Sequence, residues 1–453
     1  MELLFTLMAT VVALGLLVTI HEYGHFWVAR RCGVKVLRFS IGFGPALYTW
    51  HDRRGTEYAI AAIPLGGYVK MLDEREGPVP AAELGQAFNR KPVGQRIAIV
   101  AAGPVANFLL AIAAFWLIAV LGVTTLVPVL GPVEADTPAA RAGLHENLEL
   151  IAIDGEPTPS WHDVNLQLIR RLGETGVLKV EAQERDGESP QIYAVQLDSW
   201  LKGAEEPDPL AALGMASWQP KVAPRIGQVE PGGAAERAGL QPGDLIVAVN
   251  GEPVSDWVSE VVPAIQANPQ KKLLLDIERD AKQVELELIP AAKAQNDEVL
   301  GYIGAGVAGF EWPADMMREI HHNPLAAVPV ALQKTWGMTA LTLDSLKKML
   351  TGLVSAKNLS GPITIAKVAG ASAKSGLESF LSFIAYLSIS LGVLNLLPVP
   401  VLDGGHLVYY VAELIRGKPL SERIQTWGLQ IGLSLIVGVM LFAIYNDISR
   451  LGG

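Results

Sequence analysis

Four stretches of this chain carry no charged side chain over lengths that suit a membrane span. They are residues 3–20, whose helical pattern continues to Ala29, and residues 97–130, 379–401 and 426–445. About 20 apolar residues in a helix cross the hydrocarbon core of a bilayer, which is roughly 30 Å thick. Helices buried in a soluble enzyme usually keep a polar edge at such lengths. We therefore expect a polytopic α-helical membrane protein with four transmembrane helices.

Basic residues near these stretches predict the orientation. Residues 30–96 contain 11 Lys and Arg side chains, and the connection after the third stretch contains Arg416, Lys418 and Arg423. Cytoplasmic loops carry such an excess of Lys and Arg, so both segments should face the cytoplasm. Residues 124–320 hold 32 acidic and 15 basic side chains. This acidic excess is larger than the net negative charge of the whole chain, which is −10. This acidic segment should lie outside the cytoplasm, and its charge argues against a nucleic-acid partner.

The spans define an expected domain organisation, with helices that lie in the outer membrane interface before the third span. The amphipathic pattern of residues 324–353 suits such helices, although a buried hinge fits the same pattern. The expected order is a first span at 1–31, a cytoplasmic segment at 32–96 with a membrane-associated β-hairpin at about 56–72, a second span at 97–122, two α/β domains at 123–216 and 217–310, interfacial helices and a linker at 311–371, a third span at 372–401, a cytoplasmic loop at 402–425 and a fourth span at 426–447.

The acidic segment contains an internal duplication. Residues 131–144 match residues 227–240 at a constant offset of 96, and the register continues to Trp161 and Trp257. Each copy reads as a strand, a short helix ending in Ala-Gly-Leu, another strand and an Asp-Gly or Asn-Gly turn. The second copy, with its Pro-Gly-Asp turn at 242–244, resembles PDZ domains of bacterial proteases, which bind extended peptides on a sheet edge. The first copy departs from this pattern at residues 145–147, so peptide binding is less expected there; a size filter or a spacer would also fit.

The first span ends in the pentapeptide His21-Glu22-Tyr23-Gly24-His25. Residues four apart lie on one face of a helix, so both imidazoles can reach one zinc ion while Glu22 serves as general base. Three ionisable groups at the end of an uncharged span are costly unless they are paired or bind a metal. The chain's only cysteine is Cys32, so zinc must be held by His and carboxylates; we expect Cys32 to be a small apolar filler.

A catalytic zinc site needs a third protein ligand, and the third span offers one. Asp403 is the only carboxylate in residues 379–406, which contain the uncharged run of this span and its end, and it should lie at the same cytoplasmic depth as the motif of the first span. Pro398 and Pro400 cannot continue a helix and should expose backbone carbonyls. A plain turn at the membrane edge is the alternative for this segment. His406 is a second candidate ligand, although a turn residue or a supporting partner is the better interpretation.

The two motifs in combination resemble the site-2 protease family of intramembrane zinc metalloproteases, particularly its branch in Gram-negative bacteria. Further stretches carry the resemblance over essentially the whole chain: residues 29–35, 39–45, 63–74, 103–107 and 359–362. The resemblance implies that His21, His25 and Asp403 bind Zn²⁺, that Glu22 is the base, and that the protein lies in the bacterial inner membrane with periplasmic PDZ-like domains. It implies membrane-spanning substrates, namely the stub of an anti-sigma factor and leftover signal peptides.

A transmembrane helix must be extended before it can be cleaved, and several residues are candidates for binding the extended chain. Residues 57–71 read as a hairpin with its turn near 64–67, and the resemblance implies that it pairs with substrate. Gly66 and Gly67 would leave room for a peptide. The resemblance assigns Asn395 to the substrate backbone, although a helix-packing amide is an alternative. Asn107 follows a Gly-Pro pair, and we expect it to support the site instead of touching substrate.

Two other functions were weighed. An inactive membrane scaffold with PDZ-like domains would carry the motif as a vestige, but Glu22 and a third ligand at matching depth argue against it. A transporter could use the same His and Asp residues as a proton relay. Four spans without an inverted repeat give that interpretation little support.

Overall fold

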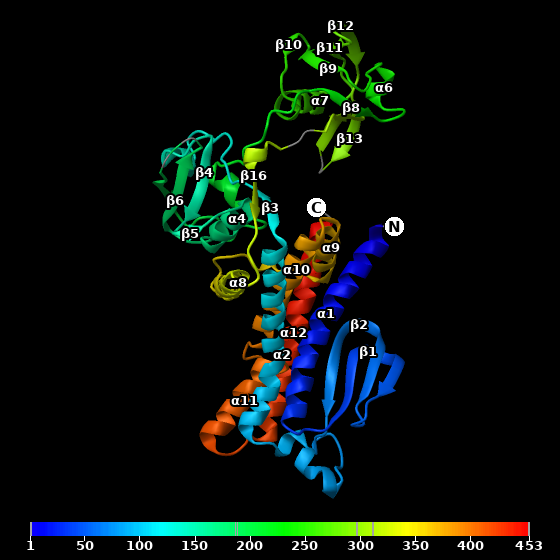
Figure 1. The fold of residues 1–453 in the computed structure, drawn as a ribbon, viewed down its shortest axis with the longest axis vertical. Helices are drawn as coiled ribbons and strands as arrows, with labels where there is room; N and C mark the ends of the chain where they lie inside the picture. Colours follow the sequence, from blue (N-terminus) through cyan, green and yellow to red (C-terminus); the bar gives the residue numbers. More distant parts are fainter. Residues whose placement is uncertain (1, 186, 188, 296–297, 310–311, 452–453) are drawn as a thin grey trace.

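A computed structural model describes residues 2–185, 187, 189–295, 298–309 and 312–451. Helices form an elongated bundle at one end of the molecule, and two units rich in β-strands lie at the opposite end (Figure 1). Both chain termini lie at the end of the bundle that faces these units. The predicted boundary at residues 310 and 311 lies outside the described residues.

Four helices of the described chain are long and apolar enough to cross a membrane, and each contains one of the uncharged stretches or most of it. They are α1 (Glu2–Arg31), α2 (Val93–Leu121), α10 (Leu377–Asn395) and α12 (Glu422–Leu451). Glycines and prolines limit them, because Gly122 ends α2 with a positive φ of 83° and Gly376 precedes α10 with a φ of 112°. The third span was predicted over 372–401, but Gly376 and Pro398 restrict its helix to residues 377–395.

The remaining helices of the bundle are α8 (Ala327–Leu350), α9 (Pro362–Lys374) and α11 (Asp403–Arg416), with short 3₁₀ turns η1 (Ala81–Gln86), η2 (Phe88–Arg90), η4 (Ala314–Met316) and η5 (Ala356–Asn358) outside them. The predicted loop at 402–425 is therefore largely a helix, which begins at Asp403 itself. Helix α8 runs across the bundle and is seen nearly end-on in Figure 1.

A sheet of two long strands, β1 (Val36–His51) and β2 (Glu57–Met71), lies beside α1 (Figure 1). The chain reverses at residues 52–56. Ile41 in β1 lies opposite both Ile60 and Gly67 of β2, so residues 38–41 separate the two halves of β2. The predicted hairpin within 56–72 is corrected accordingly: its two arms pair with β1 and not with each other. The sequence analysis missed β1, although its aromatic and β-branched residues are typical of a strand.

Two units beyond the bundle have the same sheet order. The first unit contains α3 (Pro138–Arg141), β4 (Leu148–Ile153), β5 (Glu156–Pro157), α4 (Trp161–Arg170), β6 (Gly176–Glu184) and β7 (Gln191–Leu197). The second unit contains α6 (Ala234–Arg237), β9 (Leu245–Val249), β10 (Glu252–Pro253), η3 (Trp257–Val261), α7 (Val262–Gln266), β11 (Leu273–Arg279) and β12 (Lys282–Leu288). Their sheets run β5-β4-β6-β7 and β10-β9-β11-β12. Each unit has its own apolar core.

Shorter elements complete the two units or link them to the bundle: β3 (Val123–Leu126), α5 (Pro209–Leu213), β8 (Ile226–Val229), β13 (Ala291–Gln295), β14 (Glu298–Tyr302), β15 (Ala305–Val307) and β16 (Met317–Ile320). Strand β3 leaves α2 and pairs antiparallel with β16, which returns to the bundle. The chain therefore leaves the bundle and re-enters it through one two-stranded ribbon.

Candidate metal centre

Close packing of α1 against α2 positions the two imidazoles of the motif. His21 and His25 lie one turn apart on α1, and each is only 9% exposed. A side chain at Gly24 would meet the backbone of Ala102, and one at Gly103 would meet both imidazole rings. The glycines thus allow the helices to approach until the rings lie between them. Sequence reasoning missed Gly103, although the Gly-Pro pair within an apolar run marked this position.

The orientation of His25 is determined by a backbone carbonyl. His25 Nδ1 lies 2.8 Å from the carbonyl oxygen of Ile99, which can only accept a hydrogen bond, so Nδ1 carries the proton. Nε2 of the neutral ring then presents a lone pair. Such a partner on the far nitrogen is typical of histidines that bind metals.

Asn107 lies in the same way against His21. Its Nδ2 is 3.2 Å from His21 Nδ1, while its Oδ1 is buried without a hydrogen-bond partner. A half-turn of the amide places Oδ1 on His21 Nδ1, where it accepts the ring proton and leaves Nε2 free. The backbone carbonyl of Asn107 accepts a 2.9 Å hydrogen bond from Ser388 Oγ on α10. The predicted supporting position of Asn107 thus coincides with a contact to one of the candidate ligands.

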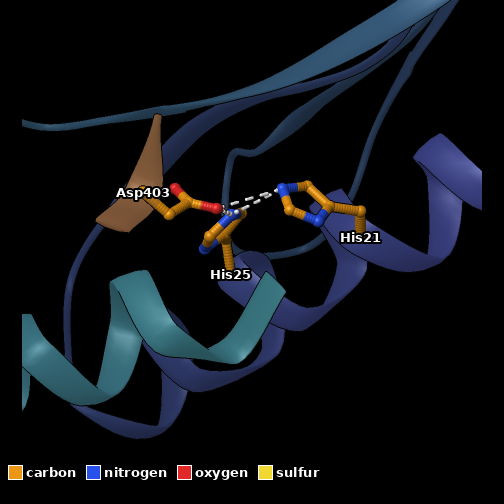
Figure 2. A group of neighbouring side chains, drawn as sticks. All are labelled: His21, His25 and Asp403. Carbon is orange, nitrogen blue, oxygen red and sulfur yellow. Dashed lines mark hydrogen bonds and ion pairs between the residues drawn. The ribbon is translucent and has the colours of Figure 1, made fainter. Parts of the chain in front are cut away.

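The third candidate ligand comes from the segment between α10 and α11. Figure 2 shows the Asp403 carboxylate pointing at both imidazoles. Asp403 Oδ2 lies 3.3 Å from His21 Nε2 and 3.5 Å from His25 Nε2, and the two Nε2 atoms are 3.2 Å apart. Asp403 begins α11, so its charge lies at a helix N-terminus, where an anion is stabilised.

These three distances fit a zinc ion. Ligand atoms at 2.0–2.1 Å from a tetrahedral zinc lie about 3.3 Å from one another. Three lone pairs facing each other at this spacing would repel without a cation between them. Of the described residues, only this set of His, Cys, Asp and Glu side chains is grouped closely enough to hold a metal ion.

Prolines and glycines place the Asp403 segment. Pro398 and Pro400 lie in residues 396–402, where no helix forms, and Val401 has a φ of 136°. A β-branched residue with a positive φ costs on the order of 1–3 kcal/mol, so the surrounding packing must stabilise this turn. Gly404 and Gly405 touch the backbone of Leu397 and Val399. At this glycine pair the start of α11 therefore lies directly against the backbone of the preceding turn.

The other candidate residues surround a cavity of about 480 Å³. Glu22, Asn395 and His406 line it together with the three candidate ligands. His406 is not part of the group close enough to share one metal ion. No hydrogen bond to the side-chain amide of Asn395 is found in the described part of the chain, so this amide is available to a bound molecule.

Strand β2 forms one wall of this cavity through Tyr68, Val69 and Met71. A side chain at Gly67 would meet the Ser40 carbonyl at 2.7 Å and Glu22 Cγ at 3.2 Å, whereas one at Gly66 would meet the Phe43 ring. The glycines therefore let β2 pass close to Glu22 and β1. The space that was predicted to admit a peptide is occupied, on this side of the backbone, by the protein's own atoms.

Charged residues lie at the mouth of the cavity. Burial acts to raise the pKa of Asp73, but the Arg75 guanidinium, with Nη2 at 2.5 Å and Nε at 2.9 Å, holds this pKa below its usual value. The pair is therefore ionised at neutral pH.

Cys32 lies apart from the cavity and packs against the apolar cluster around Phe26 and Phe39.

Known proteins match this chain over nearly its whole length. Residues 9–439 match the family described as Peptidase family M50. The chain is 46% identical over 453 residues to "Regulator of sigma-E protease RseP" of Escherichia coli (strain K12), with full coverage of both chains. It is 42% identical over 452 residues to a "Putative zinc metalloprotease" of Vibrio cholerae, with 99% of this chain and 100% of the relative covered. A protein of the same description in Xylella fastidiosa is 44% identical over 445 residues, with 97% of each chain covered.

Proposed function

Since the chain belongs to peptidase family M50, the site-2 protease family, and is a zinc metalloprotease with several apolar helices, we propose that His21, His25 and Asp403 hold its zinc and that Glu22 is its general base. The family match confirms the predicted enzyme class and metal. The observation that supports this ligand set best is the spacing of its three donor atoms, at 3.2, 3.3 and 3.5 Å. The alternative of an inactive scaffold is not favoured.

The residues of the site have separate tasks in this proposal. Bound zinc would polarise the scissile carbonyl and make a water molecule acidic enough to attack near neutral pH. Glu22, one residue after His21 and on the wall of the same cavity, accepts the proton of the attacking water at its carboxylate. It then gives this proton to the leaving amine, so no serine or cysteine nucleophile is needed. Asn107 and the Ile99 carbonyl keep the two imidazoles in the tautomer that a metal requires.

We further propose that substrate binds as an extended chain between β2 and Asn395. Residues 67–71 of β2 pair with β1 on one side, and Tyr68, Val69 and Met71 line the cavity. An unwound substrate could add to this strand, which would satisfy its backbone groups away from water. Asn395 has a free amide to hydrogen-bond the same backbone. Gly66 and Gly67 would contribute through the path of β2, which they bring close to Glu22.

The membrane topology and substrate are also proposals. With four spans, the basic segment at 30–96 places the β1–β2 sheet and the site toward the cytoplasm, and the two β-rich units then lie in the periplasm. We propose that these units are PDZ-like and that they select substrates by peptide binding or by size. The name of the Escherichia coli relative refers to regulation of sigma-E. A membrane-spanning stub of an anti-sigma factor, and leftover signal peptides, are therefore the substrates to test first.

The decisive experiment is cleavage of a tagged single-span anti-sigma stub in liposomes by the wild type, Glu22→Gln and Asp403→Ala. The wild type should cut within the span and lose activity with a zinc chelator. Glu22→Gln should keep zinc and lose cleavage, whereas Asp403→Ala should lose both. Normal turnover by Asp403→Ala would contradict the ligand assignment. Absence of cleavage by a folded, zinc-loaded wild type would contradict the choice of substrate.

A further inference from the structure

Helix α12 is the least enclosed of the four apolar helices, yet it touches the segment that carries Asp403. Only 11% of its apolar window is buried, compared with 39% for α2. Its first turns nevertheless carry Gly428 and Gly432, one turn apart on the same face, and both lie against residues close to the metal centre. The contact therefore joins a largely exposed helix to a buried turn.

Gly432 lies against the backbone of Pro400. A side chain there would collide with the Pro400 carbonyl oxygen and would lie 2.7 Å from its carbonyl carbon and 3.2 Å from Val401 Cγ2. On the opposite side, a side chain at Gly405 of α11 would lie 2.6 Å from Pro400 Cα. Pro400 is thus held between two helices at positions where neither helix has room for a methyl group.

The backbone immediately after Pro400 is strained. Val401 has a φ of 136°, and Pro400 forms an isolated β-bridge with Leu402. A valine adopts this conformation only where the surrounding structure leaves no alternative. Two residues later, Asp403 points at the imidazoles. The direction of its carboxylate therefore depends on a turn that would relax if its supports moved.

A second contact lies one turn earlier on α12. The Tyr409 hydroxyl of α11 is buried without a hydrogen-bond partner and lies where a side chain at Gly428 would be, with Pro400 Cγ at 3.3 Å from the same point. A polar atom is buried there at a cost, since no partner compensates it. Helix α12 thus fits tightly at two positions, against Tyr409 of α11 at Gly428 and against the Pro400 turn at Gly432.

We propose that Gly432 is a positioning residue for the metal centre. By admitting the Pro400 carbonyl to the face of α12, it keeps the Val401 turn in its strained form and so aims Asp403 at His21 and His25. The inference rests on the proposed function, because it takes Asp403 as a zinc ligand. It also implies that any displacement of α12 lowers the affinity for zinc, although no residue of this helix belongs to the ligand group.

Zinc affinity of the purified full-length protein in detergent, measured by competition with a chromophoric chelator, tests this directly. Gly432→Val should bind zinc at least about tenfold more weakly, as is usual when residues that orient metal ligands are changed. It should also shift the visible spectrum of the cobalt-substituted protein. Gly438→Val is the matched control, because Gly438 is on the same helix with nothing within 4 Å of its side-chain position.

Equal zinc affinity and equal cobalt spectra for Gly432→Val and Gly438→Val would overturn the proposal. If Gly432→Val does not fold, Gly428→Ala is tested instead and should weaken zinc binding. Combining it with Tyr409→Phe removes the colliding hydroxyl and should restore zinc binding. Failure of the double variant to restore affinity would also overturn the proposal. Asp403→Ala separates the two levels: unchanged zinc binding there refutes the ligand set itself.

Discussion

The two β-rich units have the same sheet order but differ in their attachment to the bundle. The first unit is attached to two helices of the bundle. A 2.7 Å hydrogen bond joins His162 Nε2 to the hydroxyl of Tyr386 on α10, and Arg170 donates a 3.2 Å hydrogen bond to the carbonyl of Gly337 on α8. In the described part of residues 226–307, no hydrogen bond or ion pair joins the second unit to a helix of the bundle. Figure 1 shows the second unit farther away. A duplicated fold has therefore become one fixed and one projecting unit.

Lys348 is the main polar link of the first unit to α8. Its side chain is buried, with Nζ at 2.8 Å from Glu174 of the first unit and 3.2 Å from Asp344 of α8, and it also donates to the Arg170 carbonyl. Val354 adds an apolar contact to the core of this unit. We therefore expect the first unit to keep its position on the bundle and the second unit to be free to change position.

Among the changes that test this difference between the two units, Lys348→Met is expected to have the largest effect. The change leaves Asp344 without a cation, while Glu174 keeps only its ion pair with Arg171. It also removes the buried donor to the Arg170 carbonyl, so it should cost about 3 kcal/mol of local stability in the first unit. Hydrogen exchange of β4 and β6 in detergent measures this. Lys272→Met, which removes an exposed pair with Glu287 in the second unit, is the matched control and should cost no more than about 0.5 kcal/mol. Equal costs would show that Lys348 is not the link.

Arg279→Met should have the next largest effect, confined to the second unit. Arg279 Nε and Nη2 each lie 2.7 Å from the carboxylate of Asp244, which is 1% exposed. Loss of the guanidinium leaves this carboxylate unpaired and should cost about 2 kcal/mol, measured by exchange of β9 and β11. The first unit has the apolar Leu148 at the position 96 residues before Asp244. Faster exchange in β4 as well would show that the units are coupled.

Acid should distinguish the units by a smaller amount. Burial acts to raise the pKa of Asp244, but Arg279 and the Gln241 N–H lower it below the usual value. A lowered folded-state pKa contributes stability that is fully present above the unfolded value, about 3.9, and is lost as the pH falls through the folded value. Between pH 6 and pH 3 the second unit should therefore lose stability through this group, because the unfolded chain takes up the proton first as the pH falls. In Asp244→Asn this part of the pH dependence should be absent; its persistence would assign the effect elsewhere.

The smallest effect on the bundle is expected from removing the second unit. Arg225 and Ala308 are joined by a 2.7 Å backbone hydrogen bond, so a short Gly-Ser linker can replace residues 226–307. Thermal unfolding and zinc content should stay within error of the full chain, while the range of substrates cut should widen or change. Loss of zinc from the folded deletion variant would contradict the separation of selection from chemistry.

Local patterns predicted the parts of this protein that depend on neighbouring residues. Uncharged runs gave the four apolar helices, and the spacing of His21 and His25 gave two candidate ligands on one helix face. Asp403 was predicted as the third candidate ligand because a catalytic zinc site needs three protein ligands. The enzyme class and the zinc were predicted from motifs in combination, and the family match confirms both.

The remaining features depend on contacts between distant segments, which no local pattern encodes. Strand β1 lies between the two halves of β2, and only the folded sheet shows this. Gly103 is needed because His21 and His25 lie against α2 at that point. In the sequence Lys348 is one of several scattered lysines, and only the folded structure shows its ion pair with Glu174 of the first unit. In the same way, Gly428 and Gly432 read as ordinary residues of an apolar helix.

The ribbon of β3 and β16 has a consequence for how such a chain can change in evolution. Everything between them, residues 127–316, leaves and returns through four paired positions, from Val123 opposite Ile320 to Leu126 opposite Met317. Because the two ends of this block lie side by side in the ribbon, the gene segment that encodes it can be lost, duplicated or exchanged while the apolar helices of the bundle keep their connections. The helical bundle with its candidate metal centre and the block of β-rich units can therefore evolve at different rates.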